Sequence, residues 1–222
     1  MKKYKNYLFI LLIFTTVSTF GYSTKSGSFT NEDDKSGYLS DLEREVVEEL
    51  NLARTHPDEY AGYLTTYSKL FVGRELREPG EITILTEEGK SAVNEAISFL
   101  KKQKSLSLLT ASPGMSKAAG DMVRMQETTN QTGHVGKDGS KFSDRLSRYG
   151  TWGGSCGENI DYGNNTARKI VMSLIVDDGV SNRGHRTSIF TPEFNRVGVA
   201  CGMHQKFRYM CVIEYAGSYN EK

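Results

Sequence analysis

The residues best suited to chemistry lie in three short glycine-containing motifs in the second half of the chain. These motifs centre on His134, Glu158 and His185. Neutral imidazole and carboxylate groups are ligands for divalent metals, and they also serve as proton donors and acceptors. The spacings between the three residues are far too long for a motif on one helix. The side chains can therefore meet only if the fold brings distant segments together.

The N-terminus has the pattern of a secretory signal peptide. Three lysines precede an apolar run from Tyr7 to Val17, about eleven residues, which is too short to span a bilayer as a helix. We predict a signal peptide over residues 1–22, a polar, disordered leader over residues 23–39 and one folded domain over residues 40–222. The expected location is outside the cell, or in the periplasm or at the cell surface if the source is bacterial.

The charge of the chain excludes two classes of partner. The first 22 residues hold three lysines and no acid, so their removal lowers the formal net charge from +1 to −2. A nearly neutral chain lacks the excess of positive charge with which proteins bind nucleic acid or anionic membranes. No other apolar run is long enough to cross a bilayer. We therefore expect no nucleic-acid partner, and no membrane span once the signal peptide is cleaved.

Hydrophobic spacing predicts helices first and then helices mixed with strands. The pattern Ser40-Asp-Leu-Glu43 is a capping box that starts the first helix. Further helices are expected near residues 60–70, 87–102, 112–125, 142–149 and 166–175, with loops over 73–80 and 132–139. A strand over 155–162 and a hairpin of 197–203 with 207–215 complete the elements. This order predicts the α+β class, as a three-layer α-β-α sandwich with a small antiparallel sheet.

The cysteines can be partly assigned from the predicted hairpin. If the chain turns between residues 204 and 208, Cys201 and Cys211 lie directly opposite each other, at a separation that suits a disulfide. Secretion favours its oxidation. Cys156 is then left over. It is either a buried free thiol or a reactive or intermolecular one.

The motifs also occur in an order that resembles a known family. They are Asn51-Leu-Ala-Arg54, Gly133-His-Val135, Gly157-Glu-Asn-Ile160, Asp177-Asp-Gly179, Gly184-His-Arg186 and a closing hairpin from Val197 to Gly217. Together they resemble the CAP superfamily, which comprises cysteine-rich secretory proteins, antigen 5 and plant pathogenesis-related proteins. The secreted microbial branch is the most similar. The resemblance covers Asp41 to Tyr219 and implies an α-β-α sandwich with a large open cleft.

In this family the cleft carries two histidines and two acids. The resemblance assigns His134 and His185 as the histidines and Glu158 as the first acid. We expect the two histidines to bind a divalent cation such as Zn²⁺, because imidazole nitrogen is the preferred ligand in such a set. The carboxylates would complete its charge and orient the rings.

The second acid departs from the family pattern. It is usually a Glu one turn after a Trp, but here Leu174 holds the Trp position and Asp177 follows three residues later. Helical periodicity places Asp178 at the centre of the apolar face and Asp177 at its edge. A side chain that lines a cleft belongs at the edge, so Asp177 is favoured and Asp178 is the alternative.

The function implied by the resemblance is binding rather than catalysis. Proposals for the family include capture of sterols or other lipids, metal-dependent contact with partners and, in isolated cases, proteolysis. No Gly-x-Ser-x-Gly motif of a serine hydrolase is present. We predict a secreted protein without catalytic residues that binds a small apolar ligand, such as a lipid or sterol, or an extracellular protein partner. The alternative is a metal-assisted or His/Glu-dependent hydrolase.

Four neighbouring residues have structural explanations. His56 and His204 are expected to be solvated, and the amide of Asn159 is expected to satisfy backbone groups of a loop. Arg186 could pair with Glu158 or with Asp177.

Overall fold

The structure is a computed structural model that describes residues 37–222, so the predicted signal peptide and most of the leader lie outside the described residues. The helices are α1 (Asp41–Thr55), α2 (Pro57–Tyr67), the short 3-10 helix η2 (Ser68–Leu70), α3 (Lys90–Leu100), α4 (Pro113–Glu127), α5 (Phe142–Tyr149), α6 (Ala167–Val176) and α7 (Gly184–Ile189). The strands are β1 (Phe71–Val72), β2 (Glu75–Leu76), β3 (Ile84–Leu85), β4 (Thr110–Ala111), β5 (Gly150–Tyr162), β6 (Arg196–His204) and β7 (Arg208–Glu221).

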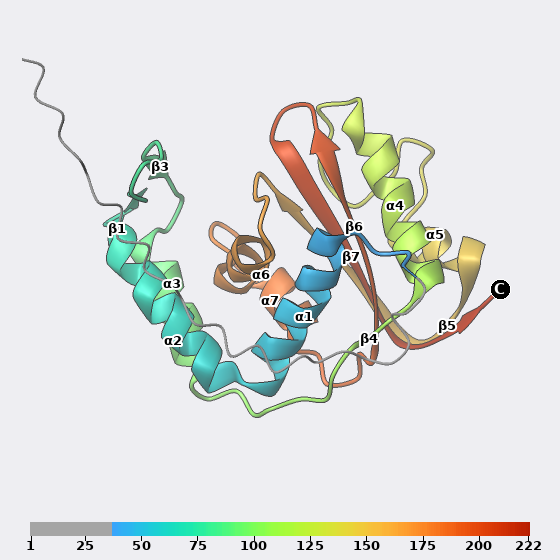
Figure 1. Ribbon diagram of the computed structural model, residues 1–222, viewed down its shortest axis with the longest axis horizontal. Coiled ribbons are helices and arrows are strands. Elements are labelled where there is room, and N and C mark those ends of the chain that lie inside the picture. The colour runs from blue at the N-terminus through green and yellow to red at the C-terminus, as the bar shows by residue number, and fades with distance from the viewer. Residues whose placement is uncertain (1–36) are drawn as a thin grey trace, which may run out of the picture.

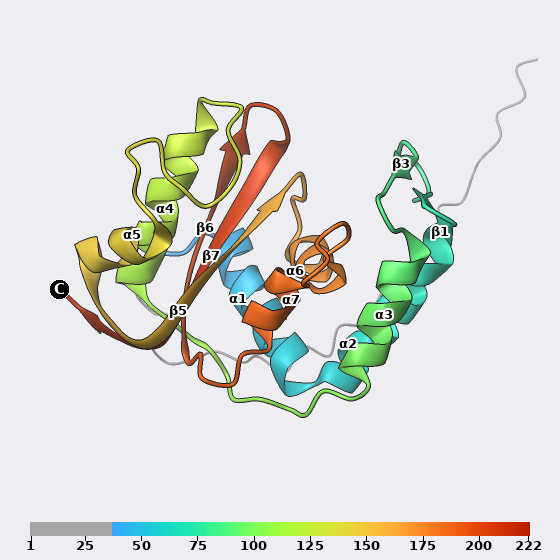
Figure 2. The same cartoon turned by 180° about the vertical axis from the view of Figure 1, so that it is seen from behind.

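The main sheet lies between two layers of helices. Its strand order is β4-β6-β7-β5, with β4 parallel to β6 and the other pairs antiparallel. Helices α4 and α5 cover one face, while α1, α6 and α7 cover the other (Figures 1 and 2). This arrangement confirms the predicted α+β class and the three-layer sandwich. No helix among residues 37–222 is long and apolar enough to cross a membrane.

Helices α2 and α3 form an arm that extends from the sandwich and carries a second, three-stranded sheet at its end (Figure 1). The prediction of a loop over residues 73–80 was wrong at β2, which pairs with both β1 and β3. The reason is Gly73, which adopts a φ of 61° and so allows a tight turn between β1 and β2. A strand of two residues is too short to be recognised from alternation.

The start of α1 follows the predicted capping box. The Oγ atom of Ser40 accepts a hydrogen bond from the Glu43 N–H at 3.4 Å, and the Glu43 carboxylate accepts one from the Ser40 N–H at 2.7 Å. Leu39, the last residue of the predicted leader, is buried in the main core. The folded domain therefore includes residues just before the helix.

A buried guanidinium joins the end of α1 to two segments that are distant in the sequence. Arg54 is 0% exposed. It donates hydrogen bonds to four backbone carbonyls, those of Ser107 at 3.1 Å, Ile189 at 2.6 Å, Thr191 at 3.0 Å and Phe194 at 2.9 Å. Burial lowers the pKa of Arg54, but a guanidinium remains protonated at physiological pH. Arg54, the last residue of the first motif, therefore has a structural role, because it links these backbone segments.

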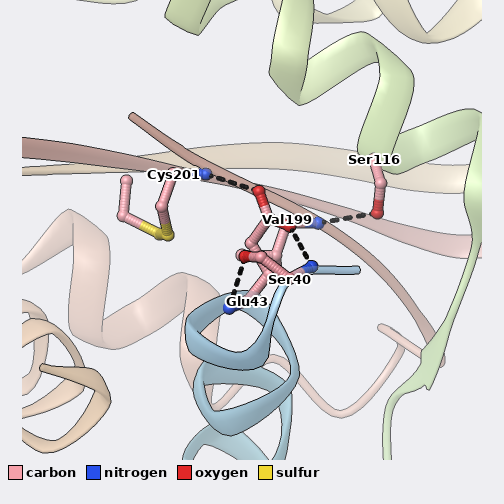
Figure 3. Close-up of a disulfide and its surroundings, with 6 residues drawn as sticks. Ser40, Glu43, Ser116, Val199 and Cys201 are labelled. Carbon is pink, nitrogen blue, oxygen red and sulfur yellow. Dashed lines mark hydrogen bonds between the residues drawn. A yellow bond between two sulfur atoms is a disulfide. The ribbon is translucent and has the colours of Figure 1, made fainter. Parts of the chain in front are cut away.

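The predicted disulfide is present. Cys201 on β6 lies directly opposite Cys211 on β7, and their sulfur atoms are bonded. The backbone N–H of Cys201 also donates to Glu43 at 2.9 Å, so the capping box of α1 is joined to the disulfide hairpin (Figure 3). Cys156 is a half-buried free thiol. Burial, together with the charge of Glu214, raises the pKa of Cys156 to about 11, which favours an inert thiol over a reactive one.

We expect the double variant Cys201→Ala/Cys211→Ala to lose about 2–3 kcal/mol of stability, since the cross-link restricts the unfolded chain. Urea denaturation of the mature protein would measure the loss. The matched control is Cys156→Ala, which removes a thiol that forms no bond and should change stability by less than about 1 kcal/mol. Equal midpoints for the double variant and the wild type would contradict a stabilising disulfide.

Candidate functional site

The first half of the candidate site pairs His134 with Glu158. His134 lies in the loop between α4 and α5, and this loop is anchored where the Gly133 N–H donates to the Tyr162 hydroxyl at 3.0 Å. Glu158 lies on β5 and its side chain is fully buried. The His134 Nδ1 atom is 2.9 Å from the Glu158 carboxylate. Because an ionised carboxylate can only accept, Nδ1 carries the hydrogen and Nε2 of His134 is left for a ligand.

Two buried residues that could not be identified from the sequence, Arg145 and Glu214, lie close to Glu158. Arg145 on α5 forms an ion pair with the Glu158 carboxylate, and both side chains are completely buried. Glu214 lies directly opposite Glu158 in the β5–β7 register, 3.6 Å from the Arg145 guanidinium. Burial, and then the charge of Glu158, raise the pKa of Glu214 well above its ordinary value. Glu214 therefore holds its proton more tightly than an ordinary glutamate, and the direct ion pair of Arg145 is with Glu158.

The second half of the site pairs His185 with Asp177. Asp177 ends α6 in the left-handed conformation, with a φ of 56°, and this turn directs its carboxylate toward the start of α7. It accepts a hydrogen bond from the backbone N–H of His185 at 2.9 Å, and it lies 2.6 Å from Nδ1 of the same residue. Asp177 thus caps α7 and orients the ring, which again leaves Nε2 for a ligand.

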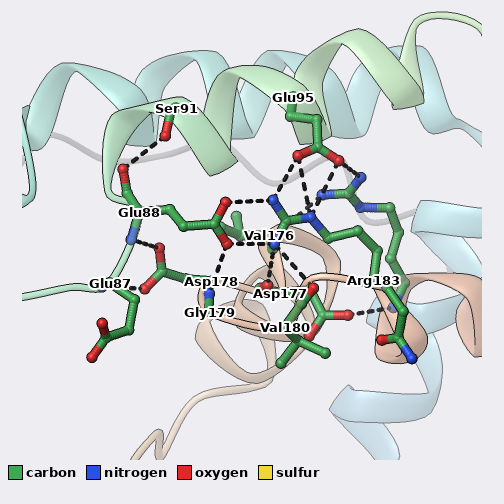
Figure 4. A network of polar contacts seen from close by, with 12 residues as sticks. Glu87, Glu88, Ser91, Glu95, Val176, Asp177, Asp178, Gly179, Val180 and Arg183 are labelled. Carbon is green, nitrogen blue, oxygen red and sulfur yellow. Dashed lines mark hydrogen bonds and ion pairs between the residues drawn. The ribbon is translucent and has the colours of Figure 1, made fainter.

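The alternative acid, Asp178, has a different role. Its carboxylate accepts hydrogen bonds from the backbone N–H groups of Glu87, Glu88 and Gly89, at 2.7–2.9 Å, just before α3 (Figure 4). Of the two aspartates that the sequence left open, Asp177 is the one that contacts the second histidine.

The Arg186 guanidinium pairs with neither acid that the sequence suggested, although its backbone N–H donates to the Asp177 carboxylate at 3.4 Å. Its guanidinium donates to the carbonyls of Ile175 and Val176 and pairs with Glu95 on α3 at 2.9 Å. Arg183 also pairs with Glu95, as well as with Glu88 (Figure 4). These charges hold α7 against α3, because two arginines on one side face two glutamates on the other.

Asn159, His204 and His56 lie in three different environments. The Asn159 amide donates to the His185 carbonyl at 3.0 Å, as its predicted structural role requires. The expectation that His204 is solvated was wrong, because this residue is 1% exposed. Tyr162 at the end of β5 and Phe207 in the hairpin turn pack against the ring, and Nε2 lies 2.9 Å from the Gln131 carbonyl. His56 is exposed.

The fold brings the two histidine–carboxylate pairs to face each other. The ring centroids of His134 and His185 are 6.4 Å apart. Each ring contacts a carboxylate through Nδ1, so two Nε2 atoms remain for one shared ligand. Within residues 37–222, no group of three or more His, Cys, Asp or Glu side chains is arranged to hold a metal ion. A cation here would therefore have two protein donors, with its other positions left to solvent or to a partner.

A cleft of about 820 Å³ adjoins the His185 half of the site. It lies between the arm and α6, and its lining includes both His185 and Asp177. The arm contributes apolar side chains, among them Phe71, Leu76 and Ile84. A volume of this size suits a small molecule.

Comparison with protein families identifies the fold. The model for CAP, the cysteine-rich secretory protein family, matches residues 48–215. The chain belongs to this family. The match confirms the resemblance carried by the six ordered motifs. A comparison with curated proteins gives no match.

Two solved structures are similar to this CAP chain. One is an outer surface protein from Borrelia burgdorferi, with 13% identity, a TM-score of 0.43 and coverage of 53% of this chain and 80% of that one. The other is an extracellular protein containing an SCP domain from Bacillus anthracis str. Ames, with 17% identity and a TM-score of 0.40. That alignment covers 57% of this chain and 37% of the Bacillus chain.

Proposed function

We propose that this CAP protein is secreted, and that it binds a small apolar ligand or an extracellular partner at the cleft beside His185. A divalent cation at His134 and His185 would assist this binding. The observation that carries the proposal is the pair of facing imidazoles, each oriented by a carboxylate, next to a cleft of about 820 Å³. The disulfide and the family support secretion.

The residues present fit a metal with two protein ligands. A histidine that ligates a metal almost always donates its other ring N–H to a carboxylate, carbonyl or water, and both His134 and His185 contact a carboxylate through Nδ1. Two imidazole ligands without a third protein donor favour moderate affinity and leave coordination positions open. Binding should weaken in acid, because a protonated imidazole cannot ligate.

We expect the double variant His134→Ala/His185→Ala to bind Zn²⁺ with an affinity at least about tenfold lower than that of the wild type. Removing only a group that orients a metal-binding histidine already lowers affinity by about tenfold, and this variant removes the histidines themselves. Isothermal titration calorimetry with ZnCl₂ would measure it. His56→Ala is the matched control, since His56 is an exposed histidine at the end of α1. Equal affinities for the wild type and the double variant would remove this pair of histidines as the metal site.

The hydrolase alternative rests on the open coordination positions. Against it, Glu158 is engaged with Arg145 and His134, and Asp177 is engaged with His185 and with backbone N–H groups. Neither carboxylate is left to activate a water molecule. Incubation of the Zn²⁺-loaded protein with a panel of peptides and esters separates the two functions, because turnover that disappears in the double histidine variant would make this protein an enzyme.

A further inference from the structure

The polar end of the cleft contains a buried acid that the proposed site does not use. Asp161 lies on β5, three residues after Glu158, and is 4% exposed. Its Oδ1 atom accepts hydrogen bonds from the Asn164 amide, at 2.9 Å, and from the Ser173 hydroxyl. Its Oδ2 atom is buried and has no hydrogen-bond partner among residues 37–222. A buried acceptor without a donor is costly, so this oxygen is a place where a ligand's donor would be stabilised.

The other charged groups around the cleft differ from Asp161, because they are engaged or exposed. The engaged groups are Arg168 with Glu49, Lys169 with Glu78 at 2.8 Å, Asp177 with His185, and Asp178 with the backbone N–H groups of residues 87–89. Glu81 and Arg208 also line the cleft and are exposed to solvent. Within the described part of the chain, Asp161 is therefore the buried carboxylate of this cleft with an acceptor to spare.

The remainder of the cleft suits an apolar body. Tyr67, Phe71, Leu76 and Ile82 line it from the arm, and Met172 lines it from α6 on the opposite side. Figure 1 shows the arm standing apart from α6, with the small sheet at its end. A ligand that fills this space would place its apolar part against the arm and one polar end near β5.

We propose that Asp161 selects the polar end of the ligand, and that this ligand is an apolar molecule ending in a hydrogen-bond donor, a hydroxyl or a primary amine, rather than in a carboxylate. The inference rests on the proposed binding of an apolar ligand at this cleft. A donor would satisfy the unpartnered Oδ2 atom. A carboxylate end offers only acceptors and would bring a like charge to Asp161.

The ionisation of Asp161 agrees with this selection. Burial raises the pKa of Asp161 to about 6, against the hydrogen bonds from Ser173 and Asn164, which lower it. At pH 7.5 the carboxyl group is therefore ionised and acts only as an acceptor.

Three probes with the same chain length test the inference: decylamine, 1-decanol and decanoate. Met172 lines the cleft, so its methyl group in ¹³C-methyl-methionine NMR spectra reports binding there. At pH 7.5 we expect decylamine and 1-decanol to bind at least about tenfold tighter than decanoate, a difference typical of one charged hydrogen bond. The variant Asp161→Asn keeps the Oδ1 acceptor but replaces Oδ2 with an N–H₂ donor. It should weaken decylamine binding about tenfold and strengthen decanoate binding.

The control variant is Asp58→Asn, an exposed acid in the first turn of α2, which should leave all three affinities unchanged. The methyl signals of the other methionines show whether each variant keeps its fold. If all three probes bind equally and Asp161→Asn changes nothing, the role of Asp161 is overturned while ligand binding at the cleft stands. If no probe shifts the Met172 signal of the wild type, the cleft is not an apolar binding site, and both the role of Asp161 and the proposed binding of a small apolar ligand fall.

Discussion

Replacing Arg54 with Met is expected to destabilise the domain by about 3–5 kcal/mol, which is a large part of the roughly 5–15 kcal/mol that stabilises an ordinary domain. Met fills a similar volume but donates no hydrogen bond. Four backbone carbonyls, from the segment after α3, the last residue of α7 and the segment after α7, would then lose their shared donor in a buried site. The loss follows from unsatisfied acceptors rather than from a cavity.

Urea denaturation monitored by circular dichroism would measure this effect. Arg124→Met is the matched control, because Arg124 is exposed on α4 and its ion pair within residues 37–222 is with a neighbour on the same helix, Asp121. We expect it to cost less than about 0.5 kcal/mol. Arg54→Lys should remain strongly destabilising, since one ammonium cannot reach four carbonyls held in the geometry of a guanidinium. If Arg54→Met denatures at the same urea concentration as Arg124→Met, the buried guanidinium does not hold these segments together.

Features encoded by neighbouring residues could be predicted from the sequence. The capping box at Ser40 starts α1, and the spacing of two strands around a short turn places Cys201 opposite Cys211. Both follow from local geometry that a few residues determine. The α5 boundaries, Phe142–Tyr149, also match the prediction.

Features that depend on tertiary contacts could not be predicted. Nothing local distinguishes Arg145 or Glu214 from surface charges, because their burial follows from the packing of α5 on β5 and from the pairing of β5 with β7. His204 looks like a solvated turn residue until the loop that contains Gln131 covers it.

The candidate site shows both cases. The family resemblance indicated His134, Glu158 and His185, and the structure brings these residues into two facing pairs. The choice of second acid needed more than periodicity. The ideal angle of about 100° per residue stops applying at Asp177, because its left-handed φ turns the chain and sends its side chain toward α7 while Asp178 turns toward α3.

Glu158 and Glu214 should respond in opposite directions when each is changed to Gln. The variant Glu214→Gln is expected to stabilise the protein by about 1–3 kcal/mol at pH 7, because burial raises the pKa of Glu214, and a carboxyl group whose pKa is raised on folding costs free energy at a pH above its unfolded pKa. Glu158→Gln is expected to destabilise it by about 2–4 kcal/mol, since it removes the charged partner of the buried Arg145. This loss is moderated because Glu214, at 3.6 Å from Arg145, can then ionise in its place.

The pH dependence gives the sharper test. The pKa of Glu214 is raised in the folded state, whereas its unfolded value is about 4.3. Below that value the carboxyl group is protonated in both states, so the Gln variant has no advantage. As the pH rises above it, the unfolded state loses the proton and the folded state keeps it, which penalises the wild type alone. The stabilisation by Glu214→Gln should therefore be nearly absent at pH 4 and grow as the pH rises toward 7.

Urea denaturation at pH 4 and pH 7 would measure both variants, with Glu45→Gln as the control for an exposed glutamate on α1. The control should change stability by less than about 0.5 kcal/mol at either pH. A loss of stability in Glu214→Gln at pH 7 would mean that Glu214 is ionised beside Arg145, and that the guanidinium serves two carboxylates rather than one. In that case Arg145, Glu158 and Glu214 together would have a net negative charge instead of zero. This charge would add to the attraction of a cation at the two histidines.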